Sequence, residues 1–259
     1  MKYFTVLKAM TRKEIIEKIR YWPNTLTGVV VFYIVFLLLF FGAKRLMGGQ
    51  PAFGQTIEGI IVGYLLWLFV LQAYSNFTNF ITREVQWGTM EQLYMSATSF
   101  GWVLSARIFA NFLVFNVYMT GSMLGLAMVT TGRYLNLDVF SLLPLVILTI
   151  AGVYGFSFLM GGLALVFKRI SNSLQILNFL FIGLIVAPLD RYPFLRFFPL
   201  SQGTSMINEV MTKGASMTDF PLTDLLFLVG NSFFYLGLGF LGFKLLERTA
   251  QRRGLLGHY

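Results

Sequence analysis

The chain has 259 residues, of which 56% are hydrophobic and only 12% are charged. Soluble domains carry roughly 25% charged residues, so this composition is typical of a chain whose solvent is mostly lipid. The sequence has no cysteine and one histidine, His258. These counts exclude disulfides, thiolate metal sites and most histidine-based catalysis. Lys and Arg outnumber Asp and Glu by 20 to 11, so the formal net charge is +9.

Residues 1–22 precede the first apolar run and are expected to form an amphipathic helix on the membrane surface. Six residues recur at three- and four-residue steps and share one face of such a helix: Phe4, Leu7, Thr11, Ile15, Ile19 and Trp22. The segment is also basic, which suits an anionic inner leaflet. A plain flank of the first membrane span is the alternative that the pattern leaves open.

Six apolar runs follow within residues 23–259. They are Thr25–Ala43, Ile57–Ile81, Gly101–Thr130, Phe140–Phe167, Ser171–Ala187 and Leu222–Leu246. Because about 20 apolar residues cross the hydrocarbon core, the sequence predicts an all-α integral membrane protein with six spans. With both termini in the cytoplasm, the inner segments hold 14 of the 20 basic residues. The positive-inside rule therefore predicts a multi-pass protein of the cytoplasmic membrane with both termini inside, and the excess of positive charge implies no nucleic acid partner.

Amide side chains interrupt three of the predicted spans. They are Gln72, Asn76 and Asn79 in the second, Asn111 and Asn116 in the third, and Asn172, Gln175 and Asn178 in the fifth. Such residues either hydrogen-bond one helix to another or line a substrate pathway, and the sequence leaves both interpretations open. Ionisable residues are nearly missing from the span centres. Because ion-coupled carriers keep carboxylates or histidines there, we expect the energy for any transport to come from a partner.

Motifs for chemistry within the chain itself are missing or misleading. There is no nucleotide-binding P-loop. A G-x-G-x-x-G pattern at Gly237, Gly239 and Gly242 lies inside a predicted span, so these glycines are expected to allow close helix contact. The pairs Gly59/Gly63 and Gly121/Gly125 are interpreted in the same way. The chain is expected to have no catalytic site and to hold no metal or cofactor.

Two connecting segments are long. The inner one, Thr82–Ser99, contains a helix-like stretch that either docks into a soluble partner as a lever or only caps the helix bundle. The outer one, Pro188–Pro221, is rich in proline and too long for a simple loop. Four of its residues would share the apolar face of a short helix: Met206, Ile207, Val210 and Met211. A folded surface loop is the alternative for this segment.

The inner loop carries a family resemblance. Its pattern R-E-x-x-x-G-T-M-E-Q-L-x-x-S, from Arg83 to Ser96, resembles the signature loop of ABC type-2 exporter permeases. The order of other features agrees over nearly the whole chain. These are the basic N-terminal helix, the six spans, the run G-G-L-A-L-V-F-K-R at Gly161–Arg169, the outer segment with prolines and the tail R-R-G-L-L-G-H-Y.

The resemblance implies the membrane-spanning subunit of an ATP-driven exporter. Such permeases are half-transporters that pair with a second permease, identical or different, and with separate ATPase subunits that bind ATP and Mg. The residues implied in coupling to the ATPase are Glu84, Gly88, Thr89, Glu91, Gln92 and Leu93. The outer segment would be a re-entrant helical hairpin. The implied cargo is amphipathic, a drug, a lipid or a lipid-linked glycan, and membrane lipids surround the protein. The alternatives are an ion-coupled secondary transporter and a channel or scaffold protein.

Overall fold

We describe a computed structural model of the chain. It describes residues 2–46, 57–90, 92, 95, 100–132, 134–167, 170–187, 189 and 191–253. Every regular element in these ranges is a helix. The α-helices are α1 (Lys2–Arg20), α2 (Trp22–Leu46), α3 (Ile57–Gln86), α5 (Phe100–Phe115), α6 (Gly121–Thr131), α7 (Val139–Phe167), α8 (Ser171–Val186), α9 (Ser201–Lys213) and α10 (Leu222–Arg252). The all-α class expected from the sequence is confirmed.

Five helical segments are long and apolar enough to cross a membrane. They are Trp22–Gly42, Glu58–Gln86, Gly101–Thr131, Val139–Phe167 and Leu222–Arg252. The third combines α5, the π-helical segment η2 (Asn116–Thr120) and α6. The fifth predicted span corresponds to α8, which has 16 residues. At 1.5 Å per residue, α8 is about 24 Å long, shorter than the hydrocarbon core of about 30 Å. The described residues therefore contain five candidate spans and one shorter apolar helix, as in a multi-pass membrane protein.

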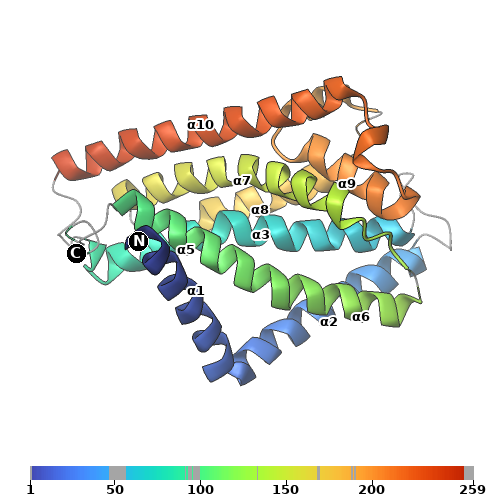
Figure 1. The fold of residues 1–259 in the computed structure, drawn as a ribbon, viewed down its shortest axis with the longest axis horizontal. Helices are drawn as coiled ribbons and strands as arrows, with labels where there is room; N and C mark the ends of the chain where they lie inside the picture. Colours follow the sequence, from blue (N-terminus) through green and yellow to red (C-terminus); the bar gives the residue numbers. More distant parts are fainter. Residues whose placement is uncertain are drawn as a thin grey trace.

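The helices run roughly side by side, and α10 lies along α7 on one side of the bundle (Figure 1). Helix α3 contacts α7, α8, α9 and α5, and more than half of its most apolar window is buried, so it is the central helix. On the opposite side, α1 and α2 form a V, with α1 beginning beside the start of α5 and α2 running toward α6. The V has its bend where α1 ends at Arg20 and α2 begins at Trp22.

One end of the bundle is basic. It is the end on the left of Figure 1, where α3 and α10 finish and α5 starts. Five basic side chains lie in these terminal segments: Arg83, Lys244, Arg248, Arg252 and Arg253. We call it the basic end. The topology thus brings together five of the 14 basic residues that the sequence assigned to the inner face.

Glycines let α7 and α10 approach until their backbones touch. A Cβ at position 239 would lie 2.5 Å from the Gly155 Cα, and one at position 242 would lie 2.8 Å from the Leu159 Cδ1. The prediction of close helix contact is therefore confirmed at Gly239 and Gly242. At Gly237, no described atom lies within 4 Å of an added Cβ. The same holds for the pair Gly121/Gly125, so the described residues show no close contact there.

Candidate functional site

A cluster of polar side chains joins three helices inside the bundle. Asn111 on α5 is at its centre, because its Oδ1 accepts hydrogen bonds from Gln72 Nε2, at 2.6 Å, and from Asn76 Nδ2. The Nδ2 of Asn111 donates to the Oε2 of Glu14 on α1, at 3.1 Å. Gln72 and Asn76 are one turn apart on α3, so both amides reach the same acceptor. We call Glu14, Gln72, Asn76 and Asn111 the Asn111 cluster.

Glu14 is the member of this cluster that sequence reasoning missed. Only 5% of its surface is exposed, although it belongs to a basic helix with an amphipathic pattern. Leu7, Thr11, Glu14 and Lys18 follow one another at steps of four, three and four residues, the spacing of a second helix face. That spacing was the signal available in the sequence. The burial of Glu14 shows that the bundle interior is not empty of ionisable groups.

The predicted apolar face of α1 is only partly covered. Leu7 is half-buried, whereas Phe4, Ile15 and Ile19 are exposed, with 72% of the Phe4 surface accessible. The buried face of α1 is thus rotated from the predicted one toward Glu14. The start of the helix is held by a hydrogen bond from Trp102 Nε1 to the Tyr3 carbonyl, at 3.1 Å. The exposed apolar face stays available to lipid, as expected of an interfacial helix.

The other predicted amides do not join the cluster. Asn178 on α8 accepts a hydrogen bond from Trp67 Nε1 on α3, at 2.9 Å, and so links those two helices. Asn116 bonds within its own helix, donating to the Phe112 carbonyl at 2.7 Å. The remaining three amides are exposed in the described structure: Asn79, Asn172 and Gln175. Helix-to-helix bonding therefore accounts for four of the eight predicted residues: Gln72, Asn76, Asn111 and Asn178.

The turn that follows α3 gives three residues of the signature loop, Glu84, Gly88 and Thr89, a structural role. Gly88 has a φ of +67°, a left-handed conformation that favours glycine. This turn lets the Thr89 backbone N–H donate to the Glu84 carbonyl at 3.1 Å, which ends the helix. The Thr89 hydroxyl also donates to the Glu84 carboxylate, at 2.5 Å. Met90 follows and is fully buried among residues of α3, α5, α7 and α10. We call Glu84, Gly88, Thr89 and Met90 the α3 turn.

Around the α3 turn, the surface of the basic end carries exposed side chains, some of them large and apolar. Trp87 is 69% exposed and Met95 is 86% exposed, and Gln92 is also exposed. Glu91 and Leu93, two of the residues implied in coupling, lie outside the described residues. Trp87 was not among the predicted site residues. The available signal was a large aromatic residue directly before Gly88 of the signature loop.

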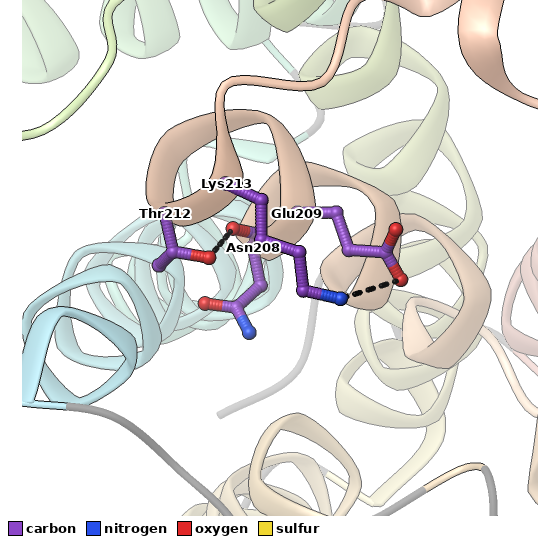
Figure 2. A network of polar contacts seen from close by, with 4 residues as sticks. All are labelled: Asn208, Glu209, Thr212 and Lys213. Carbon is purple, nitrogen blue, oxygen red and sulfur yellow. Dashed lines mark hydrogen bonds and ion pairs between the residues drawn. The ribbon is translucent and has the colours of Figure 1, made fainter.

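At the opposite end, α9 is the helix expected within the outer segment. Its four predicted apolar residues, Met206, Ile207, Val210 and Met211, are all buried. Figure 2 shows the polar side of the same helix, where the Lys213 Nζ lies 3.8 Å from the Glu209 Oε1 and the Thr212 hydroxyl donates to the Asn208 carbonyl.

The chain that leads into α9 is tied to α10. Asn231 Nδ2 donates to the carbonyls of Arg196 and Phe198, both at 3.1 Å, and the Tyr235 hydroxyl donates to the Phe197 carbonyl at 3.0 Å. The described residues of this segment form one α-helix with a short 3₁₀ turn on each side, Pro193–Phe197 and Met217–Asp219. The outer segment is therefore held against the bundle.

Comparisons with known proteins add no relative to this description. No protein-family model matches the chain, and no curated protein matches it. Within the ranges that the structure describes, no group of His, Cys, Asp and Glu residues could hold a metal ion. The site is therefore described by its own geometry, which consists of a buried polar cluster and a capped turn on the same helix.

Proposed function

We propose that this chain is the membrane-spanning subunit of an ATP-driven exporter of the ABC type-2 class, with its ATP hydrolysed by a separate subunit. The observation that carries the proposal is the α3 turn. Three residues of the signature loop, Glu84, Gly88 and Thr89, form one capped turn at the basic end. In this proposal a turn built in this way presents Trp87, which it carries, to the cytoplasm in a fixed direction.

The exposed side chains beside this turn support a docking role. An exposed tryptophan next to a buried anchor is a common feature of protein interfaces, where aromatic residues contribute much of the binding energy. Trp87 and Met95 provide such surface, and Met90 fixes the loop to the bundle. In this proposal the ATPase subunit binds there, and Glu91 and Leu93 belong to the same coupling segment.

Helix α3 would connect this docking surface to the interior. Asn76 and Glu84 are eight residues apart on one continuous helix, about 12 Å along its axis. A displacement of the α3 turn would therefore reach the Asn111 cluster with no flexible joint between them. In this proposal the amides that bond helix to helix, those of the cluster and Asn178, also border the inner part of a pathway for an amphipathic cargo.

The remaining parts of the proposal follow the family architecture. Helix α8 completes a sixth span, and α9 with its flanking turns is the re-entrant element that closes the outer side. Two copies of the chain, or this chain and a related one, enclose the pathway in the cytoplasmic membrane. Both termini lie in the cytoplasm, since the basic end faces inward. The cargo is a drug, a lipid or a lipid-linked glycan, because the spans offer amides and aromatic rings and few charges.

One observation favours a second candidate function, an ion-coupled secondary transporter. Glu14 places a buried carboxyl group against Asn111, and an ionisable residue inside a membrane bundle is a candidate ion site. The two candidates differ in their energy source, and this difference can be tested directly.

The test uses the chain co-expressed with a candidate ABC ATPase subunit, purified and reconstituted in vesicles. We expect ATP to drive the export of a fluorescent phospholipid analogue. Thr89→Val removes the hydroxyl that holds the Glu84 carboxylate and should lower lipid export per ATP hydrolysed. Thr82→Val is the matched control, because the Thr82 hydroxyl bonds only to the Thr78 carbonyl of the same helix.

Two results would contradict the exporter proposal. In one, Thr89→Val and Thr82→Val both pump at the wild-type ratio, which would remove the coupling role of the α3 turn. In the other, a proton gradient drives transport without any ATPase and Glu14→Gln abolishes it, which would establish the secondary transporter.

A further inference from the structure

A groove of about 590 Å³ lies between the third span and the bend of the V, where α1 ends and α2 begins. Its lining surface is almost wholly apolar. The apolar walls come from six side chains: Ile15, Ile19 and Trp22 on one side, and Leu113, Val114 and Val117 on the other. A groove of this size and chemistry, open along the side of a membrane protein, suits an acyl chain.

The rim of the groove carries a positive charge. Lys18 lines it, and the Lys18 Nζ lies 5.5 Å from the centroid of the Tyr118 ring on the opposite wall. The acid one turn earlier, Glu14, is buried and hydrogen-bonded to Asn111, so it faces away from the exposed surface. The rest of α1 beyond the rim is basic. Lys8, Arg12, Lys13 and Arg20 are exposed there, against Glu17 alone among the acids.

The far wall is built on the π-helical segment η2. Val117 and Tyr118 belong to it, and Val117 is 71% exposed. π-helical turns interrupt the regular helix ladder and are frequent at functional sites. Here Asn116 compensates within the helix, because its side chain donates to the Phe112 carbonyl and accepts from the Thr120 hydroxyl at 3.3 Å. The segment is thus stabilised in a shape that turns apolar side chains into the groove.

We propose that this groove binds one anionic phospholipid of the inner leaflet, with an acyl chain between α1 and η2 and its phosphate at Lys18. An apolar groove with a lysine at its rim, on a helix whose exposed charge is positive, matches an apolar chain attached to a negative head group. Such a lipid would wedge α1 against the third span, next to the contact between Glu14 and Asn111. This inference does not depend on the energy source of transport.

The test measures quenching of Trp22 fluorescence by lipids with brominated chains. The full-length protein is placed in lipid nanodiscs that contain brominated phosphatidylglycerol or, at the same mole fraction, brominated phosphatidylcholine. The protein has four tryptophans, and the fluorescence that is lost in Trp22→Phe gives the contribution of Trp22. We expect phosphatidylglycerol to be enriched about fivefold over phosphatidylcholine at Trp22, the ratio that corresponds to about 1 kcal/mol for one basic residue at a membrane surface.

Three variants locate the lipid. Lys18→Gln should abolish the preference for phosphatidylglycerol, whereas Lys13→Gln, on the same helix but outside the groove, should keep it. Val114→Phe fills the groove and should lower quenching by both lipids.

The proposal fails if the two lipids quench Trp22 equally, or if Lys18→Gln and Lys13→Gln behave alike. It also fails if neither lipid quenches Trp22 and Ile19→Cys, in this cysteine-free chain, forms a disulfide-linked dimer. That result would show that a second copy of the chain fills the groove.

Discussion

Replacing Gly239 by alanine should separate α7 from α10. The added Cβ would lie 2.5 Å from the Gly155 Cα, whereas ordinary contact begins at 3.4 Å. The atoms that the Cβ would meet are backbone atoms, which cannot turn aside as a side chain can. The Gly155 carbonyl oxygen lies closer still, so the two helices would have to move apart by at least about 1 Å, with loss of packing on both sides of the contact. Overpacking of this kind costs about 1–3 kcal/mol, and we expect Gly239→Ala to lower the free energy of unfolding by that amount.

The matched control is Gly237→Ala on the same helix. No described atom lies within 4 Å of a Cβ at position 237, so this variant keeps the helix contact. Alanine also favours a helix over glycine by up to about 1 kcal/mol, so Gly237→Ala should be neutral or stabilising. The assay is the unfolding free energy in mixed micelles titrated with dodecyl sulfate and followed by circular dichroism. Equal stability of the two variants would refute the close backbone contact of α7 with α10.

Three further variants test the candidate site through the same unfolding assay. Asn111→Leu removes the centre of the Asn111 cluster and leaves Glu14 buried without its amide partner, so we expect a loss of about 1–3 kcal/mol; a smaller loss than that of Asn79→Leu, on an exposed face, would contradict the cluster. Gly88→Ala forces a side chain into a left-handed conformation and should cost about 1–2 kcal/mol, with Gly101→Ala, which meets no described atom, as its control. Trp67→Phe removes one bond between α3 and α8 and should cost about 0.6 kcal/mol.

The positions of the helices could be predicted well from the sequence because each apolar run has a length fixed by the bilayer. Five of the six predicted runs coincide with helices long enough to cross a membrane. The remaining run, Ser171–Ala187, falls on α8, which is as apolar as the others but shorter. This difference could be seen in the sequence, because Ser171–Ala187 is the shortest of the six predicted runs.

The partners of the polar side chains could not be predicted from spacing. Gln72 and Asn76 share a helix face with Asn79, yet only the first two meet Asn111, because α5 crosses α3 at that height. Glu14 was harder still, since it lies outside every predicted span and its burial depends on the tilt of α1 against α5. Helix periodicity predicts which residues share a face, and only tertiary packing decides which other helix that face meets.

The two kinds of helix contact in this protein predict where it can change shape. Helices α7 and α10 interlock through backbone atoms at Gly155 and Gly239, and the Phe77 ring of α3 packs directly onto α7 at Gly161. Sliding these helices would force atoms into one another, so we expect α3, α7 and α10 to move as one unit. Helix α1 meets the bundle instead through side chains, those of the Asn111 cluster and Trp102, which donates to the Tyr3 carbonyl. The amides of the cluster can exchange partners without moving a backbone. A conformational change that opens the interior is therefore expected at the contact of α1 and α5 with α3, the place where Glu14 is held.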